Sequence, residues 1–177
     1  EDALGFIWMA TDQGLSKLDT ATGTFTRFFH NPDDIYSLNS SFVTRVLADN
    51  NMNIWATTGE GLNCIDARSN VVTRIGHPAT EGQRASGAIA ALAEDREGMM
   101  WVGLGSLLRL DPKRRVFVPS AENPTQESVK LISSITVVQD GSVWLGTYGF
   151  GLQRADREDG TFLVFTERDG LPNNVFY

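Results

Sequence analysis

The chain has 177 residues, of which 41% are hydrophobic and 21% charged, so it is long enough and apolar enough for a globular domain with a substantial core. The formal net charge of -7 argues against a nucleic acid as the main partner, because that affinity comes from Lys and Arg side chains that neutralise phosphates. No apolar run approaches the ~20 residues that span a bilayer, so we expect no direct membrane insertion, and the single cysteine excludes an internal disulfide.

Four tryptophans divide the chain at near-equal intervals of 47, 46 and 43 residues. Each lies in a similar stretch, from "GFIWMATDQGLSKLD" at the first to "GSVWLGTYGFGLQRAD" at the last. An acidic residue precedes each tryptophan by six positions, or four at the last, and another follows ten to twelve positions later. This recurrence predicts four structural repeats, at about 1–41, 42–87, 88–133 and 134–177. The tryptophans are Trp8, Trp55, Trp101 and Trp144, and the acids are Asp2, Asp49, Asp95, Asp140, Asp19, Asp66, Asp111 and Asp156.

Each repeat reads as four short strands rich in Val, Ile, Phe and Trp and separated by Gly, Asn and Asp. In the second repeat a first strand at 42–49 precedes the tryptophan strand "NIWAT" and then "GLNCID", and last strands are expected at 24–29 and 161–165. The segment "SGAIAALAED" at 86–95 would favour a helix by composition, but the register of the repeat places it on a first strand. Four antiparallel strands per 40–50 residues predict an all-β fold of β-propeller blades.

We expect the four tryptophans to pack between neighbouring blades as structural residues, since each ring buries a large apolar area. The repeated aspartates are candidates for acid–base chemistry. Their presence in every repeat instead favours turn residues whose short side chains accept backbone N–H bonds, and we expect no catalysis.

The two ends of the chain read as parts of first strands. Glu1 and Asp2 resemble the last residues of such a strand, and "NNVFY" at 173–177 resembles its beginning. The sequence therefore predicts a partial propeller cut through its innermost strand. An open arc, a small ring closed by its two ends, or a ring completed by two chains would each fit. Because open sheet edges favour association, we expect pairing with another propeller segment or a second copy.

Candidate ligand residues lie in the loops of one face. The turn after each tryptophan strand shares a face with the long links between blades, at 30–41, 76–87, 118–130 and 166–174, and loops on a rigid scaffold commonly bind ligands. Tyr148 and Phe150, flanked by Gly149 and Gly151, are the foremost candidates for stacking on a sugar or an aromatic ligand. The other candidates are Asp12, Gln13, Tyr36, Glu60 and Arg84, with His30, Asp33, Asp34, His77 and Arg168 as further link residues.

The sequence predicts no metal or cofactor. His30 and His77 each follow their tryptophan by 22 residues and stand beside or near a proline, which favours a structural role in the links. Cys64 aligns with Lys17, Arg109 and Arg154 at a position we expect to be partly exposed. Without a histidine nearby in the sequence, it is a weak candidate for a nucleophile.

The stretches "EDREGMMWVGL…LLRLD", "GSVWLGTYGFGLQRAD" and "ADNNMNIWATTGEGLNCID" resemble the two-component regulator propeller repeat, with Leu104 in place of the usual Thr. The resemblance implies the periplasmic sensor propeller of a membrane-bound hybrid histidine kinase or a related signalling protein, many of which respond to carbohydrates. It therefore implies a non-catalytic, ligand-sensing segment that binds an oligosaccharide or another small molecule. A propeller module that binds only protein remains the alternative, and a propeller enzyme is a third.

Overall fold

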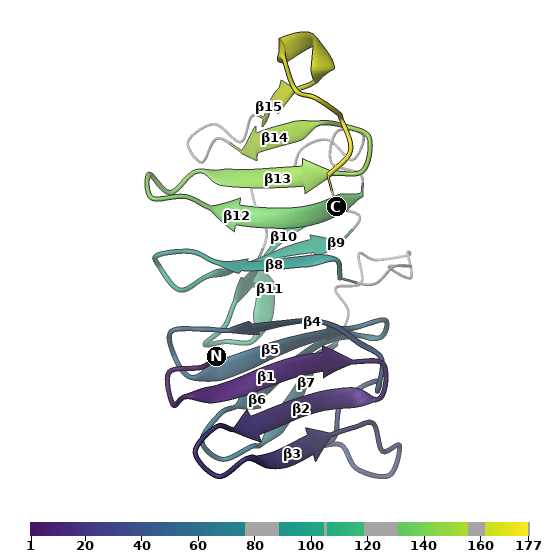
Figure 1. Ribbon diagram of the computed structural model, residues 1–177, viewed down its shortest axis with the longest axis vertical. Coiled ribbons are helices and arrows are strands. Elements are labelled where there is room, and N and C mark those ends of the chain that lie inside the picture. The colour runs from purple at the N-terminus through teal and green to yellow at the C-terminus, as the bar shows by residue number, and fades with distance from the viewer. Residues whose placement is uncertain (77–88, 105, 119–130, 156–161, 177) are drawn as a thin grey trace. The chain divides into compact units, whose positions relative to one another are not determined.

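The computed structural model describes residues 1–76, 89–104, 106–118, 131–155 and 162–176, and within them the chain is all-β with four antiparallel sheets. It divides into unit 1 (Glu1–Ile89) and unit 2 (Ala90–Tyr177), each with two sheets (Figure 1). In unit 1 the strands are β1 (Phe6–Thr11), β2 (Gly14–Asp19), β3 (Thr24–Phe28), β4 (Val43–Ala48), β5 (Asn53–Thr58), β6 (Gly61–Asp66) and β7 (Val72–Gly76). In unit 2 they are β8 (Ala91–Glu94), β9 (Met100–Leu104), β10 (Ser106–Asp111), β11 (Val116–Val118), β12 (Ile132–Val137), β13 (Val143–Thr147), β14 (Leu152–Ala155) and β15 (Phe162–Phe165), followed by the 3-10 turn η1 (Glu167–Asp169).

The sheets have the strand order of propeller blades, as the repeat predicts. Three of them have four strands in chain order, β4-β5-β6-β7, β8-β9-β10-β11 and β12-β13-β14-β15, and the described part of the first has three, β1-β2-β3. In the four-stranded sheets the first strand pairs with the strand that carries the tryptophan. The alanine-rich segment forms strand β8 over Ala91–Glu94, so the register of the repeat overrides the local helix propensity.

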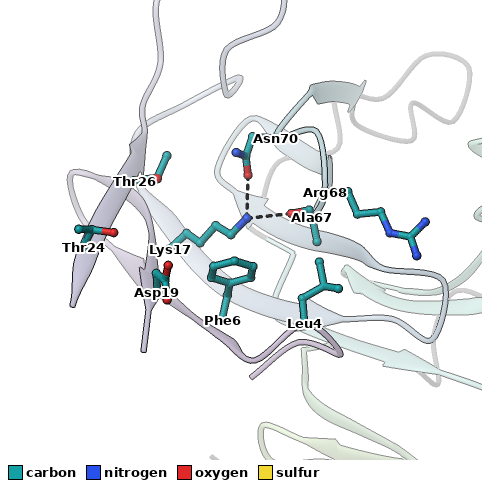
Figure 2. Close-up of a pocket in the computed structure, with 9 residues that line it drawn as sticks. All are labelled: Leu4, Phe6, Lys17, Asp19, Thr24, Thr26, Ala67, Arg68 and Asn70. Atoms are coloured by element: carbon teal, nitrogen blue, oxygen red, sulfur yellow. Dashed lines mark hydrogen bonds between the residues drawn. The ribbon is translucent and has the colours of Figure 1, made fainter. Parts of the chain in front are cut away.

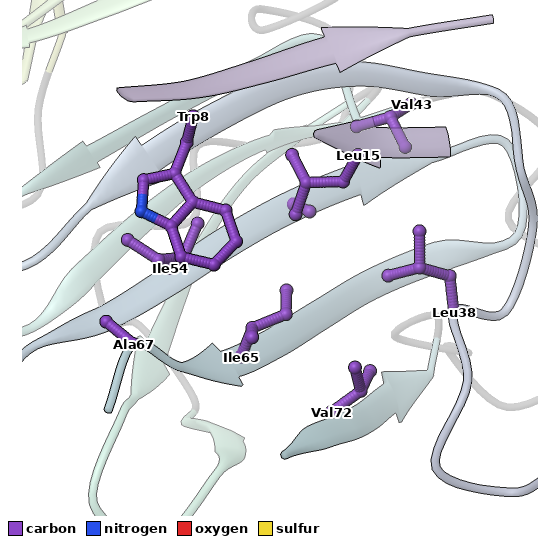
Figure 3. Close-up of a cluster of buried hydrophobic side chains, with 9 residues drawn as sticks. Trp8, Leu15, Leu38, Val43, Ile54, Ile65, Ala67 and Val72 are labelled. Atoms are coloured by element: carbon purple, nitrogen blue, oxygen red, sulfur yellow. The ribbon is translucent and has the colours of Figure 1, made fainter. Parts of the chain in front are cut away.

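The core of unit 1 lies between its two sheets (Figure 3). Trp8 and Leu15 from the first sheet pack with Ile54, Ile65 and other side chains of the second. Unit 2 has an equivalent core, in which Trp101 packs with side chains of the β12–β15 sheet. Burial of apolar area of this kind is the main stabilising contribution within each unit.

In unit 2 the residue two positions after each tryptophan is a glycine, Gly103 or Gly146, and neighbouring side chains lie close against it. A Cβ on Gly103 would lie 2.8 Å from Ile132 Cγ2, at the first residue of β12. A Cβ on Gly146 would lie 2.9 Å from Phe176 Cβ, and Phe176 aligns with Ile132 in the repeat. Gly103 therefore lets β9 approach β12 of the neighbouring sheet closely, and Gly146 leaves room for Ser134 of its own sheet and for Phe176.

The aspartates form the turns, as the sequence predicts. Asp19, Asp66 and Asp111 each accept two backbone N–H groups from the following turn residues. Asp156 lies outside the described residues. These carboxylates thus accept hydrogen bonds from the backbone of their own turns, which is the role expected of Asp in turns.

Candidate functional site

The strand directions place the turn after each tryptophan strand at the same end of its sheet as the link that follows the sheet. We call this end the link face. In unit 1 it comprises residues 12–13, 29–42 and 59–60, and in unit 2 residues 148–151 and 166–176.

The turn that carries Tyr148 and Phe150 is braced by the last described residues of the chain. Tyr148 N–H donates to Leu131 O and forms a bridge with Val175, while Gly151 N–H donates to Asn174 O. Phe150 N–H donates to Thr147 Oγ1 at 3.2 Å. The two residues are nonetheless 48% and 42% exposed, on a turn whose backbone is held by hydrogen bonds. Aromatic faces on a rigid turn suit stacking on apolar or sugar surfaces.

The link at 29–42 presents a second group of exposed apolar side chains, Phe29, Ile35, Tyr36 and Phe42. Arg74 on β7 fixes this link: its guanidinium donates to the carbonyl oxygens of Asn31, Asp34, Ser37 and Leu38 and to Ser37 Oγ. A shallow cavity of about 220 Å³ lies beside the link, with Tyr36 in its wall. The sequence missed Arg74, because an arginine on an outer strand carries no motif.

The polar candidates of unit 1 are separate from one another. Asp12, Gln13 and Glu60 are exposed on two turns, and the carbonyl of Glu60 accepts the side-chain amide of Asn39. Asp33 and Asp34 lie in the link, where Asp34 Oδ1 accepts the Tyr36 N–H. None of these side chains converges with another in a hydrogen bond between the described residues.

Some of the remaining candidates lie among the residues that the structure describes and others do not. Arg168 is exposed within η1, whereas Arg84 and His77 lie outside the described residues. His30 Nδ1 lies 2.7 Å from Leu38 O, so the imidazole forms a hydrogen bond within the link. Among the residues that the structure describes, no group of three His, Cys, Asp or Glu side chains could hold a metal.

The expected exposure of Cys64 is wrong. Its residue is only 1% exposed and Lys17, at the equivalent position, is 6% exposed. Both residues stand directly opposite the tryptophan of the neighbouring strand, as do Arg109 and Arg154. The face that carries the tryptophan is buried, so its cross-strand neighbour is buried with it.

The sequence also missed a larger cavity, of about 470 Å³, at the end of the unit 1 strands opposite the link face (Figure 2). Lys17 lies in its wall with its ammonium 3.9 Å from the centre of the Phe6 ring. The only signal was the recurrence of a cation opposite the tryptophan in three of the four repeats, at Lys17, Arg109 and Arg154.

Comparisons with solved structures show the same fold. The chain is similar to the extracellular domains of two proteins of B. thetaiotaomicron that are assigned as hybrid two-component systems. For BT3049 the TM-score is 0.73 with 22% identity over 89% of this chain, and for BT4673 it is 0.79 with 18% identity over 98% of this chain. The chain spans 21% and 23% of the length of those two domains.

A third similar structure is virginiamycin B lyase from Staphylococcus aureus, with a TM-score of 0.67 and 14% identity over 91% of this chain and 52% of the lyase. No protein-family model and no curated protein sequence matches the chain. In the part of the chain that the structure covers, no helix is both long enough and apolar enough to cross a membrane.

Proposed function

We propose that the chain is a ligand-sensing propeller segment from the periplasmic part of a bacterial two-component signalling protein. It binds a carbohydrate or another small molecule at the link face and performs no catalysis. Its fold matches the extracellular domains of BT3049 and BT4673, and its repeats resemble the two-component regulator propeller repeat. One fold hosts many functions, so the similarity to a lyase supports an enzyme only if the chain also has a catalytic site.

The observation that carries the proposal is the exposed pair Tyr148 and Phe150 on a turn held by backbone hydrogen bonds. A ligand that stacks on these rings gains apolar contact without ordering the backbone first, which lowers the entropic cost of binding. The ordered link around Tyr36 offers a comparable surface in unit 1.

Thermal shift against a panel of oligosaccharides tests this proposal. We expect at least one sugar to raise the melting temperature of the chain, and the double substitution Tyr148→Ala and Phe150→Ala to abolish that rise. Phe25→Ala is the matched control, because Phe25 is 58% exposed on β3, away from the link face. A rise that survives the double substitution would remove both residues from the site.

A second proposal concerns association with another propeller segment or a second copy. In the described residues β1 is an edge strand of its sheet, whereas the equivalent β5, β9 and β13 each have a first strand beside them. Ile7 on β1 and Leu4 just before it are exposed. An added strand along Ile7–Thr11 would satisfy the open backbone groups of β1, as β4 does for β5.

Sedimentation or light scattering over a range of concentrations tests the association. We expect dimers or larger species at high concentration, and we expect Ile7→Lys to weaken them because a charge at a sheet edge opposes pairing. A sharp monomer at every concentration would contradict the proposal.

A further inference from the structure

We propose that the 470 Å³ cavity of unit 1 is a second binding site, which takes a small hydroxycarboxylate. It lies between the β1–β2–β3 sheet and the turn that joins β6 to β7, at the opposite strand ends from the link face. Its volume falls within the ~300–1,000 Å³ of ordinary small-molecule sites. The inference does not depend on the function proposed for Tyr148 and Phe150.

A buried cation is the centre of this site. The Lys17 ammonium donates to Ala67 O at 2.8 Å and to Asn70 Oδ1 at 2.9 Å (Figure 2). An ammonium has three N–H donors, so a ligand acceptor would compete for the third with the Phe6 ring, whose centre lies 3.9 Å from Nζ. Within the described residues no carboxylate lies within salt-bridge distance of Lys17. The Asp2 and Asp19 carboxylates interact with the Lys17 charge from beyond that distance, so a ligand carboxylate would be the first to pair with the ammonium directly.

Asn70 brings a second polar side chain to the cavity. Its Oδ1 accepts from Lys17, so the two N–H donors of Nδ2 point away from the ammonium. Asn70 is also one of the residues that line the cavity. An amide and an ammonium fixed against each other form a polar corner that suits the two oxygens of one carboxylate.

The rest of the lining suits hydroxyl groups and a short carbon chain. Thr24 and Thr26 on β3 offer hydroxyls, and Leu4 and Phe6 offer apolar surface. Asp19 also lines the cavity, and the backbone N–H of Ala21 lowers the pKa of its carboxyl, followed by a hydrogen bond with Thr22. Asp19 therefore stays ionised and accepts hydroxyl donors, but it repels a second carboxylate.

Arg68 adds a positive charge at the rim, where its side chain extends away from Lys17 (Figure 2). Lys17 and Arg68 outweigh the single carboxylate of Asp19, so the lining carries a net positive charge inside a chain whose net charge is -7. This local reversal of sign favours an anion over a neutral molecule.

Calorimetry of the whole chain with three matched probes tests the site. D-gluconate carries one carboxylate and several hydroxyls, D-sorbitol has the hydroxyls without the charge, and hexanoate has the charge without the hydroxyls. We expect gluconate to bind at least about tenfold more tightly than either control, since it alone satisfies both halves of the lining. The absence of gluconate binding, or equal binding of sorbitol, would overturn the proposal.

Substitutions then assign the binding to this cavity. Lys17→Met should weaken gluconate binding more than about tenfold, since it removes the buried charge while keeping the apolar stem. If that variant fails to fold, Thr26→Val and Arg68→Gln serve instead, each with a loss of about threefold or more. Arg114→Gln, at an exposed residue of unit 2, should leave gluconate affinity unchanged. If Thr26→Val and Arg68→Gln both leave gluconate affinity unchanged, the assignment to this cavity is overturned, whether or not the link face binds a sugar.

Discussion

The indole Nε1 of Trp55 donates a hydrogen bond of 2.8 Å to Oδ2 of Asp49, and both residues are buried. The same carboxylate accepts the backbone N–H groups of Asn51 and Asn53 and the side-chain amide of Asn53. One aspartate thus ties the turn before the tryptophan strand to the ring in the core. The relationship recurs between Asp2 and Trp8 at 2.7 Å and between Asp95 and Trp101 at 3.1 Å.

Replacing Asp49 with Ala should destabilise the chain by about 2–4 kcal/mol, because it removes these hydrogen bonds and leaves a buried indole N–H unsatisfied. The midpoint of a urea titration measures the loss. Asp140→Ala is the control, since Asp140 accepts the backbone N–H and the hydroxyl of Ser142, and the Trp144 indole donates to Ser142 Oγ instead of to the aspartate. Equal losses in the two variants would show that the indole bond contributes little.

Removing the ring itself should cost more. Trp55 is fully buried, so Trp55→Ala should lower the free energy of unfolding by about 3–5 kcal/mol. Trp144 is only half-buried and stacks on Phe165 of its own sheet at 5.7 Å, so Trp144→Ala should lose clearly less. Denaturant titration of both variants checks this order, and a loss near zero for Trp55→Ala would contradict its role in the core.

The repeat was sufficient to predict the blades, because a tryptophan, a turn aspartate and small residues recur in the same order. It even identified β8 against its helix propensity, since the positions of the flanking turns constrain the strand. It did not predict the indole bond of Asp49, because a spacing of six positions places no side chain until the intervening turn is known. The fourth repeat shows this limit. Asp140 precedes Trp144 by four positions instead of six, and the indole donates to Ser142 Oγ instead of to the aspartate.

The candidate sites were predicted less well. The link face follows from strand direction alone, so Tyr148 and Phe150 could be found in the sequence. Lys17 could not, because its burial depends on Ala67 and Asn70, which lie 50 and 53 residues away. Contacts between sheets leave little trace in a single sequence.

Acid should destabilise the chain below about pH 4. The backbone N–H of Ser69, followed by its hydroxyl, lowers the pKa of Asp66 below 3.8. A carboxyl whose pKa is lower in the folded than in the unfolded chain stabilises the fold at pH values above its unfolded pKa. That stabilisation is lost as the pH falls through the folded-state pKa. The melting temperature of the wild type should therefore fall between pH 4 and pH 2.

Asp66→Asn should make that fall shallower while lowering stability at pH 7, because the amide still accepts hydrogen bonds but does not titrate. A variant with the same pH slope as the wild type would show that Asp66 contributes nothing to the acid response. Asp12→Asn, on an exposed turn, is the control.

Two neighbouring glycines separate backbone strain from steric clash. Gly149 and Gly151 both have positive φ, but a Cβ on Gly149 meets nothing within 4 Å, whereas one on Gly151 would lie 2.0 Å from Phe165 O. Gly149→Ala should cost about 1–2 kcal/mol from conformation alone, and Gly151→Ala should cost more because β14 and β15 must separate. Thermal unfolding of the two variants gives the comparison, and equal costs would contradict the clash.

Arg74 should control the order of the link at 29–42. Arg74→Lys keeps the charge, but a single ammonium cannot reach all the acceptors that the guanidinium holds on Asn31, Asp34, Ser37 and Leu38. The amides of Asp34 and Ser37, which close the turns of this link, should then exchange with deuterium faster, while amides of β5 and β6 stay protected. Arg45→Lys is the matched control, since the Arg45 guanidinium is exposed and donates to Thr44 O. Unchanged exchange at Asp34 and Ser37 in Arg74→Lys would mean that hydrogen bonds within the link are enough to hold it.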